Sequence, residues 1–429
     1  MAVKTPVGLT QRESIPTIVM QGGTFGPMQC SNSIDSIGKK CISRQEHLYS
    51  YKNLVKVTPL AMVDDLLAVA PCGIDSLAVN VFINTQIEMK KLKFHTPDAN
   101  GKSKCHVMHI GKKNMSCPDL KVHGTPMGFV TEDTYLGDIV SQDGSNQKNV
   151  RSRVGKGIGI ISQILLMLET VSFGHYYLQI ALTLRETMFL SGILTNAEIW
   201  YNLKQSKIEE FEELDRSLLR KIFGTKISCP KEALHLESGT ISVGTYIKAR
   251  RINYLQYLLK ENNDNMLSKF FHAQYNFEVK HDWTATVRQD LIDFGIQVNL
   301  ENIKSKSEFV FKKMVKLKAQ EYELCKLNSM KGSKMENTFH GKLEIQKYLM
   351  QKNISAEDAK LVFAFRTRMA NFSENFLALI VPKCVHYATH IWITNLWRST
   401  AQLSNLTWIR KESMNISSEV KFRWKLSET

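Results

Sequence analysis

Two adjacent carboxylates, Asp64 and Asp65, lie inside an apolar stretch that runs from Leu60 to Ala70. Asp favours turns over strand interiors, so the pattern predicts a tight strand-turn-strand with buried arms and the acids at its tip. Two ionised carboxylates repel each other, and burying them unpaired is costly, so they belong at a wet cleft or beside a cation. Mg²⁺ is the hard cation that prefers carboxylate ligands. A solvated turn with two incidental acids is the alternative interpretation.

The composition is that of a globular protein with an excess of positive charge. Of 429 residues, 43% are hydrophobic and 23% are charged, and a chain of this length is expected to form two or three domains. The 56 Lys and Arg outnumber the 41 Asp and Glu, which leaves a formal net charge of +15. This excess favours a polyanionic partner such as nucleic acid but does not establish one.

The cysteines and the apolar segments bear on the compartment. The eight cysteines are scattered and form no Cys-x-x-Cys pair, which is typical of a reduced intracellular protein in the nucleus or cytoplasm. The N-terminal residues lack the continuous apolar run of a signal peptide, so we do not expect secretion. The one membrane-like segment, Phe376 to Trp397, is interrupted by Pro382 and by polar residues such as Lys383, and we expect no membrane partner.

The first third of the chain has α/β character. The glycine-rich segment Gln21 to Met28 allows close backbone approach before a helix, although a plain loop is the alternative. Mixed helical spacing predicts a helix over Ser76 to Leu92. Strands are predicted at Lys102 to Lys113 and at Thr134 to Val140, and the turn pair Asp143-Gly144 ends the second. Cys105, His106 and His109 have no second ligand pair at zinc-site spacing, so we expect no zinc there.

Beyond Gly144 the apolar residues recur at helical spacing. Buried helices are predicted between Ile160 and Leu194. The glycines at 155, 157 and 159 are interpreted as a flexible start of a helix. The clearest helix is predicted at Lys207 to Phe223, with a capping box at its start and Gly224 as its stop; the box consists of Ser206 and Glu209.

Two later segments combine basic and apolar residues. Lys248, Arg250 and Arg251 alternate with tyrosines and isoleucines, a pattern that suits a grip on a phosphate backbone or, equally, a helix with a solvated basic face. Six lysines between Lys304 and Lys318 repeat the theme, with the same two interpretations. The residues after about Glu374 show no periodicity, and the single Cys384 with His386 and His390 argues against a zinc knuckle there.

In their order, these motifs resemble the reverse transcriptase of non-LTR (LINE-type) retrotransposons. Gln21 to Met28, followed by Ser33 to Ile37, is similar to motif B. Met62-Val63-Asp64-Asp65-Leu66 is similar to motif C, usually written aromatic-Ala-Asp-Asp, and Tyr135-Leu136-Gly137 matches a Tyr-Leu-Gly that leads into the thumb. The helices expected from Arg151 to Leu259 resemble the thumb and connector, so the resemblance covers about residues 5 to 369.

The resemblance implies an α+β fold: a partial polymerase palm in residues 1–145, with a small antiparallel sheet and helices, then mainly α-helical regions. These are a thumb at 146–260 and a basic connector at 261–375, while 376–429 stay unassigned. It also implies that Asp64 and Asp65 coordinate catalytic Mg²⁺ and that Gln21 and Gly22 line the incoming nucleotide and template. RNA and DNA, as template and primer, would be the partners, and the reaction would be two-metal phosphoryl transfer.

The chain also departs from the family pattern. A further Asp on motif A precedes motif B in the family, but residues 1–20 contain no Asp, and their only acid, Glu13, lies too close to Gln21. We therefore expect a truncated RNA-directed DNA polymerase that is inactive as given. The alternative is a non-catalytic, basic nucleic-acid-binding protein derived from the element, in which Lys248, Arg250 and Arg251 hold RNA or DNA. A third possibility is that half a palm is too small to fold stably.

Overall fold

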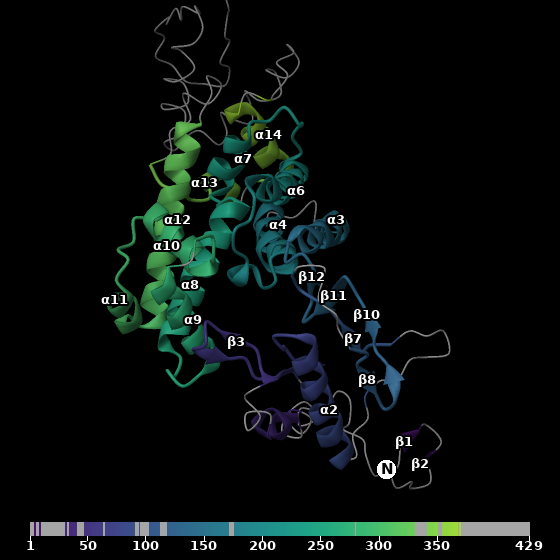
Figure 1. The fold of residues 1–429 in the computed structure, drawn as a ribbon. Helices are drawn as coiled ribbons and strands as arrows, with labels where there is room; N and C mark the ends of the chain where they lie inside the picture. The colour runs from purple at the N-terminus through teal and green to yellow at the C-terminus, as the bar shows by residue number, and fades with distance from the viewer. Residues whose placement is uncertain are drawn as a thin grey trace, which may run out of the picture. The chain divides into compact units, whose positions relative to one another are not determined.

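The computed structural model describes residues 4–5, 8–9, 31, 34–40, 47–62, 65–90, 94, 103–111, 118–170, 176–278, 280–330, 341–350, 354–367 and 369 (Figure 1). The chain divides into two units. Unit 1 comprises residues 1–172, 179–218 and 241–325, and unit 2 comprises residues 173–178, 219–240 and 326–429. Each unit is therefore built from segments that are distant in the sequence.

The strands of unit 1 are short and pair two by two. The pairs are β1 (Lys4–Thr5) with β2 (Gly8–Leu9), β3 (Ser50–Tyr51) with β4 (Val55–Lys56), β5 (Leu60–Met62) with β6 (Asp65–Leu67), β7 (His106–Val107) with β10 (Gly128–Phe129), β8 (Lys121–Val122) with β9 (Thr125–Pro126), and β11 (Glu132–Tyr135) with β12 (Asp138–Ser141). The β7–β10 pair is parallel and the others are antiparallel. The fold is thus mixed α and β, as predicted, but the described strands do not join into one palm-like sheet.

Helix α2 (Gly73–Met89) confirms the predicted helix but begins three residues earlier. Cys72 caps it, because its sulfur accepts the Asp75 backbone N–H at 3.5 Å, and the acidic side chain of Asp75 suits the positive end of the helix dipole. The helix buries Val79, Ile83 and Ile87, at intervals of four residues, against the side chains of Ile37 and Leu48. These residues form the small core of the N-terminal part of unit 1.

Strands β11 and β12 correct the prediction of a single strand over Thr134 to Val140. Tyr135 pairs with Asp138, and the two residues between them have positive φ, 48° at Leu136 and 84° at Gly137. Two successive left-handed residues are typical of the tight turn that joins hairpin strands. The Tyr-Leu-Gly motif therefore forms a hairpin turn. Gly144, at φ 68°, makes the following turn where the sequence predicted it.

The other long described elements of unit 1 are helices. They are α3 (Gln147–Glu169), most of α4 (Tyr177–Leu184), the π-helical turn η2 (Arg185–Leu190), α5 (Ser191–Ile193), the 3-10 turn η3 (Ala197–Ile199), most of α6 (Gln205–Phe223), α8 (Val243–Lys260), α9 (Met266–Phe277), α10 (Trp283–Asp293), α11 (Leu300–Ser305) and most of α12 (Glu308–Ser329). The helical periodicity beyond Gly144 is confirmed. A core that includes Leu255, Trp283, Phe311 and Val315 packs α8 to α12 together.

Helices α3 and α6 differ from the predictions in detail. The three glycines lie in the middle of α3 rather than at its entry, and Gly157 allows a close approach, since a Cβ there would lie 3.0 Å from the side chains of Ile193 and Leu214. Helix α6 begins at Gln205, so Ser206 lies inside its first turn and the predicted capping box is wrong. Gly224, with φ at 62°, ends the helix as expected.

Unit 2 contains α7 (Lys231–Ser238), α13 (Lys347–Met350) and α14 (Ala356–Arg366). Glu237 of α7 accepts hydrogen bonds from the Arg366 guanidinium at 2.8 and 3.0 Å and from the Tyr348 hydroxyl at 2.9 Å. Gly239 follows α7 at φ 66°, and a Cβ there would come within 2.2 Å of the Ile345 nitrogen. A side chain at this position would push the two segments apart.

Candidate functional site

The hairpin of β5 and β6 carries the sequence-predicted acids. Its register pairs Met62 with Asp65, which confirms the strand-turn-strand prediction, while Val63 and Asp64 lie outside the described residues. The expected burial of its arms is wrong. Ala61, Met62 and Asp65 are exposed, Met62 to 56%, and the three leucines of the hairpin are half-buried. Within the described residues β5 and β6 pair only with each other, so neither edge of the hairpin is extended by a third strand.

Tyr135 of the β11–β12 hairpin lies within electrostatic reach of Asp65. Its pKa is raised above the ordinary tyrosine value, first by burial and then by the negative charge of Asp65. The structure therefore brings the acid-bearing hairpin and the Tyr-Leu-Gly turn near each other, although about 70 residues separate them. Sequence reasoning had noted both motifs without predicting that they meet. A carboxylate and a phenol so placed can bind a cation and a hydroxyl-bearing ligand respectively.

The remaining residues of the predicted metal and nucleotide site are outside the part of the chain that the structure describes. These are Asp64, Gln21 and Gly22. Among the described residues, no group of three or more His, Cys, Asp or Glu is placed to hold a metal ion. Of the two predicted Mg²⁺ ligands the structure describes only Asp65, so the binding of Mg²⁺ stays a prediction.

The predicted nucleic-acid-binding cations of α8 are engaged inside unit 1. Arg251 makes a bidentate pair with Asp290 at 2.6 and 3.1 Å and also donates to the Trp200 carbonyl at 3.1 Å. The side chains of Arg251 and Asp290 are only 8% and 3% exposed. A buried guanidinium held on three sides is positioned to join α8 to α10 rather than to meet a ligand.

The other two cations of this group follow the same pattern. Arg250 pairs with Glu198 of η3 at 2.6 Å and donates to the Leu194 carbonyl at 2.6 Å. Lys248 pairs with Asp293 of α10, and its ammonium lies 5.0 Å from the centre of the Tyr322 ring. Of the basic residues expected on a solvated face, Arg251 is buried, whereas Lys248 and Arg250 are paired with acids and partly exposed. A role of these three residues in nucleic-acid binding stays a prediction.

The pKa shifts of the Lys248–Asp293 pair show that both members stay charged. Burial acts to lower the pKa of Lys248, but the carboxylate of Asp293 outweighs it and the pKa is raised. Burial acts to raise the pKa of Asp293, but hydrogen bonds from Lys248 and Gln289 outweigh it and the pKa is lowered. The pair is thus ionised over the whole neutral range.

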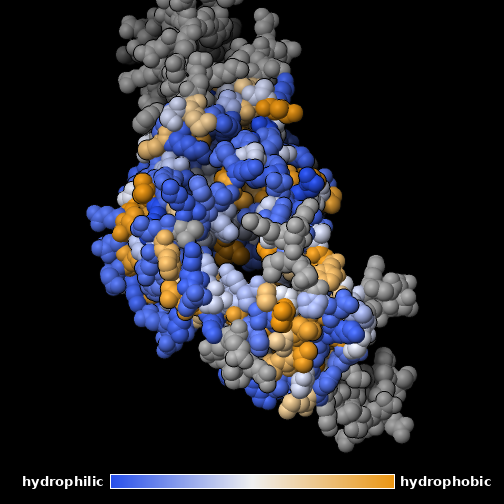
Figure 2. Space-filling view, in the orientation of Figure 1, coloured by the Kyte–Doolittle hydropathy of each residue, from blue (hydrophilic) through white to orange (hydrophobic). Residues whose placement is uncertain are grey.

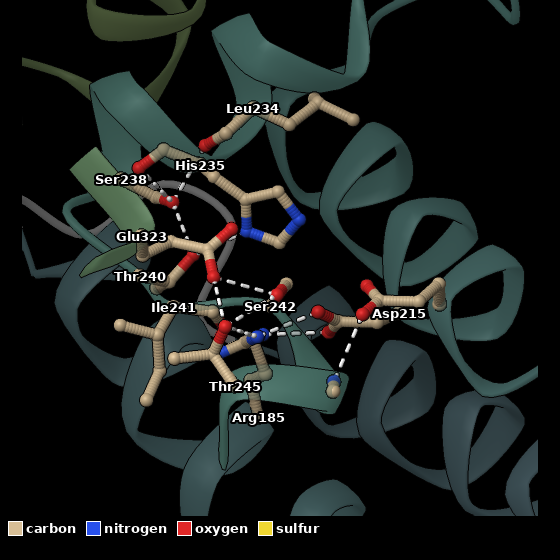
Figure 3. Close-up of polar contacts among 12 residues, drawn as sticks. Arg185, Asp215, Leu234, His235, Ser238, Thr240, Ile241, Ser242, Thr245 and Glu323 are labelled. Carbon is tan, nitrogen blue, oxygen red and sulfur yellow. Dashed lines mark hydrogen bonds and ion pairs between the residues drawn. The ribbon is translucent and has the colours of Figure 1, made fainter. Parts of the chain in front are cut away.

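A second buried ion pair was missed by sequence reasoning (Figure 3). Arg185 of the π-helical turn η2 donates to both carboxylate oxygens of Asp215 at 2.6 Å and to the Ile241 carbonyl at 3.1 Å. The two side chains are 1% and 0% exposed. The available signal was a charged residue interrupting an apolar helical run, which indicates a buried partner because an unpaired buried charge is prohibitively costly.

Beside it, Glu323 joins α12 to the start of α8. Its carboxylate accepts hydrogen bonds from the Ser242 hydroxyl at 2.7 Å and from the Thr245 hydroxyl. Figure 3 shows both contacts. The side chain of Glu323 is fully buried. The Arg185–Asp215 pair and the Glu323 contacts therefore connect helices of unit 1 through buried polar side chains.

A scan of the chain against models of known protein families finds no match, and a search among curated proteins finds none either. Of the helices that the structure describes, none combines the length and apolar character needed to cross a bilayer. The segment Phe376 to Trp397 lies outside the described residues.

Proposed function

We propose that this chain carries the motif C hairpin, thumb and connector of a reverse transcriptase of the non-LTR type, an RNA-directed DNA polymerase. The observation that carries the proposal is the antiparallel β5–β6 hairpin, in which Met62 pairs with Asp65 around the Val63-Asp64 dipeptide. The proximity of Tyr135 to Asp65 adds support, since it associates two motifs that the resemblance had linked only by their order.

In this proposal the two adjacent acids hold Mg²⁺. Carboxylate oxygens suit this ion, and a wet, exposed hairpin lets two negative charges share it. Bound Mg²⁺ would activate the primer 3′-hydroxyl and neutralise charge on the leaving pyrophosphate. The chain's own part is to present Asp64 and Asp65 from one turn, while Gln21 and Gly22 would line the nucleotide and template.

The 429-residue chain by itself is expected not to extend primers. Residues 1–20 offer no Asp to complete a three-carboxylate site, so affinity for Mg²⁺ should be weak. The test is primer extension by the purified chain on an RNA template with deoxynucleotides and Mg²⁺. Robust nucleotide addition that Asp64→Ala abolishes would overturn the expected inactivity while supporting the assignment of the acids.

A positive test of the metal site does not depend on turnover. Fe²⁺ can replace Mg²⁺ at an oxygen-ligand site and, with peroxide and ascorbate, cleaves the nearby backbone by hydroxyl radicals. We expect cleavage within and around Leu60–Leu67 that is lost in the double variant Asp64→Asn/Asp65→Asn. The control Asp264→Asn removes an exposed acid elsewhere and should retain the cleavage. Absence of cleavage at the hairpin, or cleavage that survives the double variant, contradicts the proposed site.

A second candidate function, nucleic-acid binding without catalysis, is favoured by a specific observation. The formal net charge is +15, and α12 presents lysines that are exposed to solvent. This function predicts binding that weakens steeply with salt and that Asp64→Ala leaves unchanged. Affinity that is the same in low and high salt would exclude it.

A further inference from the structure

We propose that one exposed face of α12 binds single-stranded nucleic acid, with lysines on the phosphates and an aromatic ring under a base. This face, called the α12 stripe, consists of Phe309, Lys313 and Lys316, with Lys312 at its edge. The inference rests on the nucleic-acid partner of the proposed function, and it is independent of the chemistry at Asp64 and Asp65.

Helix geometry places the members of the stripe together. Phe309, Lys313 and Lys316 follow one another at intervals of four and three residues, which is the spacing of neighbours on one helical face. The opposite face of the helix buries Phe311 and Val315 completely in the core shared by α8 to α12. The stripe therefore points away from the core, and Phe309 is 77% exposed.

Lysines outnumber acids on this part of α12. Between residues 304 and 318 there are six lysines and one acid, Glu308. Glu308 pairs with Lys312 on the same helix, and Lys318 pairs with Glu321. Among the described residues no acid pairs with Lys313 or Lys316, and both are exposed. Such a face attracts a polyanion, and binding of the polyanion to the face is favoured by release of the counterions that the polyanion carries.

The exposed ring favours a single strand over other polyanions. A base can stack on a solvent-exposed phenyl ring irrespective of the nucleotide sequence. Along the axis Lys313 lies about 6 Å beyond Phe309, so a stacked base leaves its neighbouring phosphate within reach of that flexible side chain. A duplex hides the faces of its bases and can use only the lysines. Figure 2 shows hydrophobic side chains scattered among hydrophilic ones over the region of α10 to α12.

Hydrogen bonds from α8 hold the start of α12 in place. The side-chain amide of Gln256, on α8, donates to the carbonyls of Ile303 and Lys306 at 3.0 Å each. Lys260, at the end of α8, donates to the Lys306 carbonyl at 2.7 Å. These contacts fix the junction between α11 and α12, which means that binding need not order the start of the helix.

The test is fluorescence anisotropy of a short labelled single-stranded RNA with the full chain over a series of salt concentrations. For the variant Lys313→Gln/Lys316→Gln we expect affinity to fall about tenfold at low salt, and the log–log salt slope to shrink by about 1.4, or about 0.7 for each lost phosphate contact. The control Lys269→Gln/Lys280→Gln removes two exposed lysines elsewhere in unit 1 and should bind as wild type does.

The ring is tested separately by two substitutions. Phe309→Ala should weaken binding of the single strand severalfold and leave duplex binding unchanged, whereas Phe309→Trp should retain the stacking. Circular dichroism and thermal melting of each variant verify that the fold is intact. The double variant Asp64→Ala/Asp65→Ala should bind RNA like wild type, so failure of the hairpin proposal and failure of the stripe proposal are distinguishable.

Two outcomes overturn the inference. One is equal affinity and equal salt slope for the wild type and the Lys313→Gln/Lys316→Gln variant. The other is binding to vesicles that contain phosphatidylserine, lost in the same variant while RNA binding is unchanged, which would assign the stripe to an anionic membrane surface.

Discussion

Helices α8 and α12 have the same kind of sequence and use it in opposite ways. Both interleave lysines or arginines with aromatic and aliphatic residues. On α8, Arg250 pairs with an acid of η3, and Lys248 and Arg251 pair with acids of α10. On α12, the described ion pairs of Lys312 and Lys318 are with acids one turn away on the same helix. The location of the acids in the fold therefore decides whether a basic helix is internal or outward-facing.

This difference predicts different energies for charges of the same kind. A buried ion pair has lost its hydration, so removing one partner leaves the other charge without compensation. When one partner of an exposed pair is removed, the remaining charge is still hydrated by water. Substitutions on α8 should consequently reduce stability, and those on α12 should reduce binding. The predictions that follow test this contrast, starting from the largest expected effect.

Arg251→Ala should be strongly destabilising. The substitution leaves the carboxylate of Asp290, which is 3% exposed, without its guanidinium partner. The free energy of unfolding should therefore fall by about 3–5 kcal/mol. Urea denaturation measures the change, and Lys313→Ala on α12 is the matched control, expected within about 0.5 kcal/mol of wild type. Similar losses in the two variants would abolish the distinction between the helices.

Lys248→Met should have an intermediate effect. The Lys248 side chain is 22% exposed and its partner Asp293 is 21% exposed, so a charge-assisted hydrogen bond worth about 1.5–3 kcal/mol is lost while the apolar stem is kept. A double-mutant cycle with Asp293→Asn isolates the pair. A coupling energy indistinguishable from zero would mean that the contact contributes nothing to stability.

The same pair should give stability a defined pH dependence. The lowered pKa of Asp293 means that its contribution is present above the unfolded value, near 3.8, and is lost as the pH falls through the lower folded value. The raised pKa of Lys248 means that its contribution is present below the unfolded value, near 10.5, and is lost as the pH rises through the higher folded value. Relative to Lys248→Met/Asp293→Asn, wild type should lose its advantage at both extremes, which urea titrations across pH would reveal.

The smallest effect is expected for Glu308→Gln on α12. A hydrogen bond from Lys312 and its charge lower the pKa of Glu308, but the two side chains are 69% and 58% exposed. Solvent and salt screen such a pair, so the melting temperature should not change measurably at physiological salt. A clear decrease that persists in high salt would show that α12 depends on its own ion pairs as α8 does.

Features set by neighbouring residues could be predicted from the sequence, and those set by distant residues could not. The β5–β6 hairpin, α2 and the stop of α6 at Gly224 were predictable because turn and capping preferences are local. The β11–β12 turn was missed because it needs a positive φ at a leucine, Leu136, which propensity disfavours.

The charge pairing of α8 was beyond local reasoning. Asp290 is 39 residues from Arg251, and Glu198 is 52 residues from Arg250, so no spacing rule connects them. The effect of the Asp65 charge on the pKa of Tyr135, 70 residues away in the sequence, is likewise a product of the fold. For the candidate site, the sequence identified Asp65 and the hairpin that carries it, whereas the exposure of that hairpin and its neighbour came from the structure.

Lysine acylation followed by mass spectrometry tests the contrast between the two helices most directly. In the folded protein, Lys313 and Lys316 should react readily with an acylating reagent and be protected by single-stranded RNA. Lys248 should react slowly with or without RNA, because its pKa is raised and Asp293 holds it, and should react only after denaturation. If Lys248 reacts as fast as Lys313 in the folded protein, or if RNA protects Lys248 and leaves Lys313 and Lys316 reactive, the assignment of the two helices is contradicted.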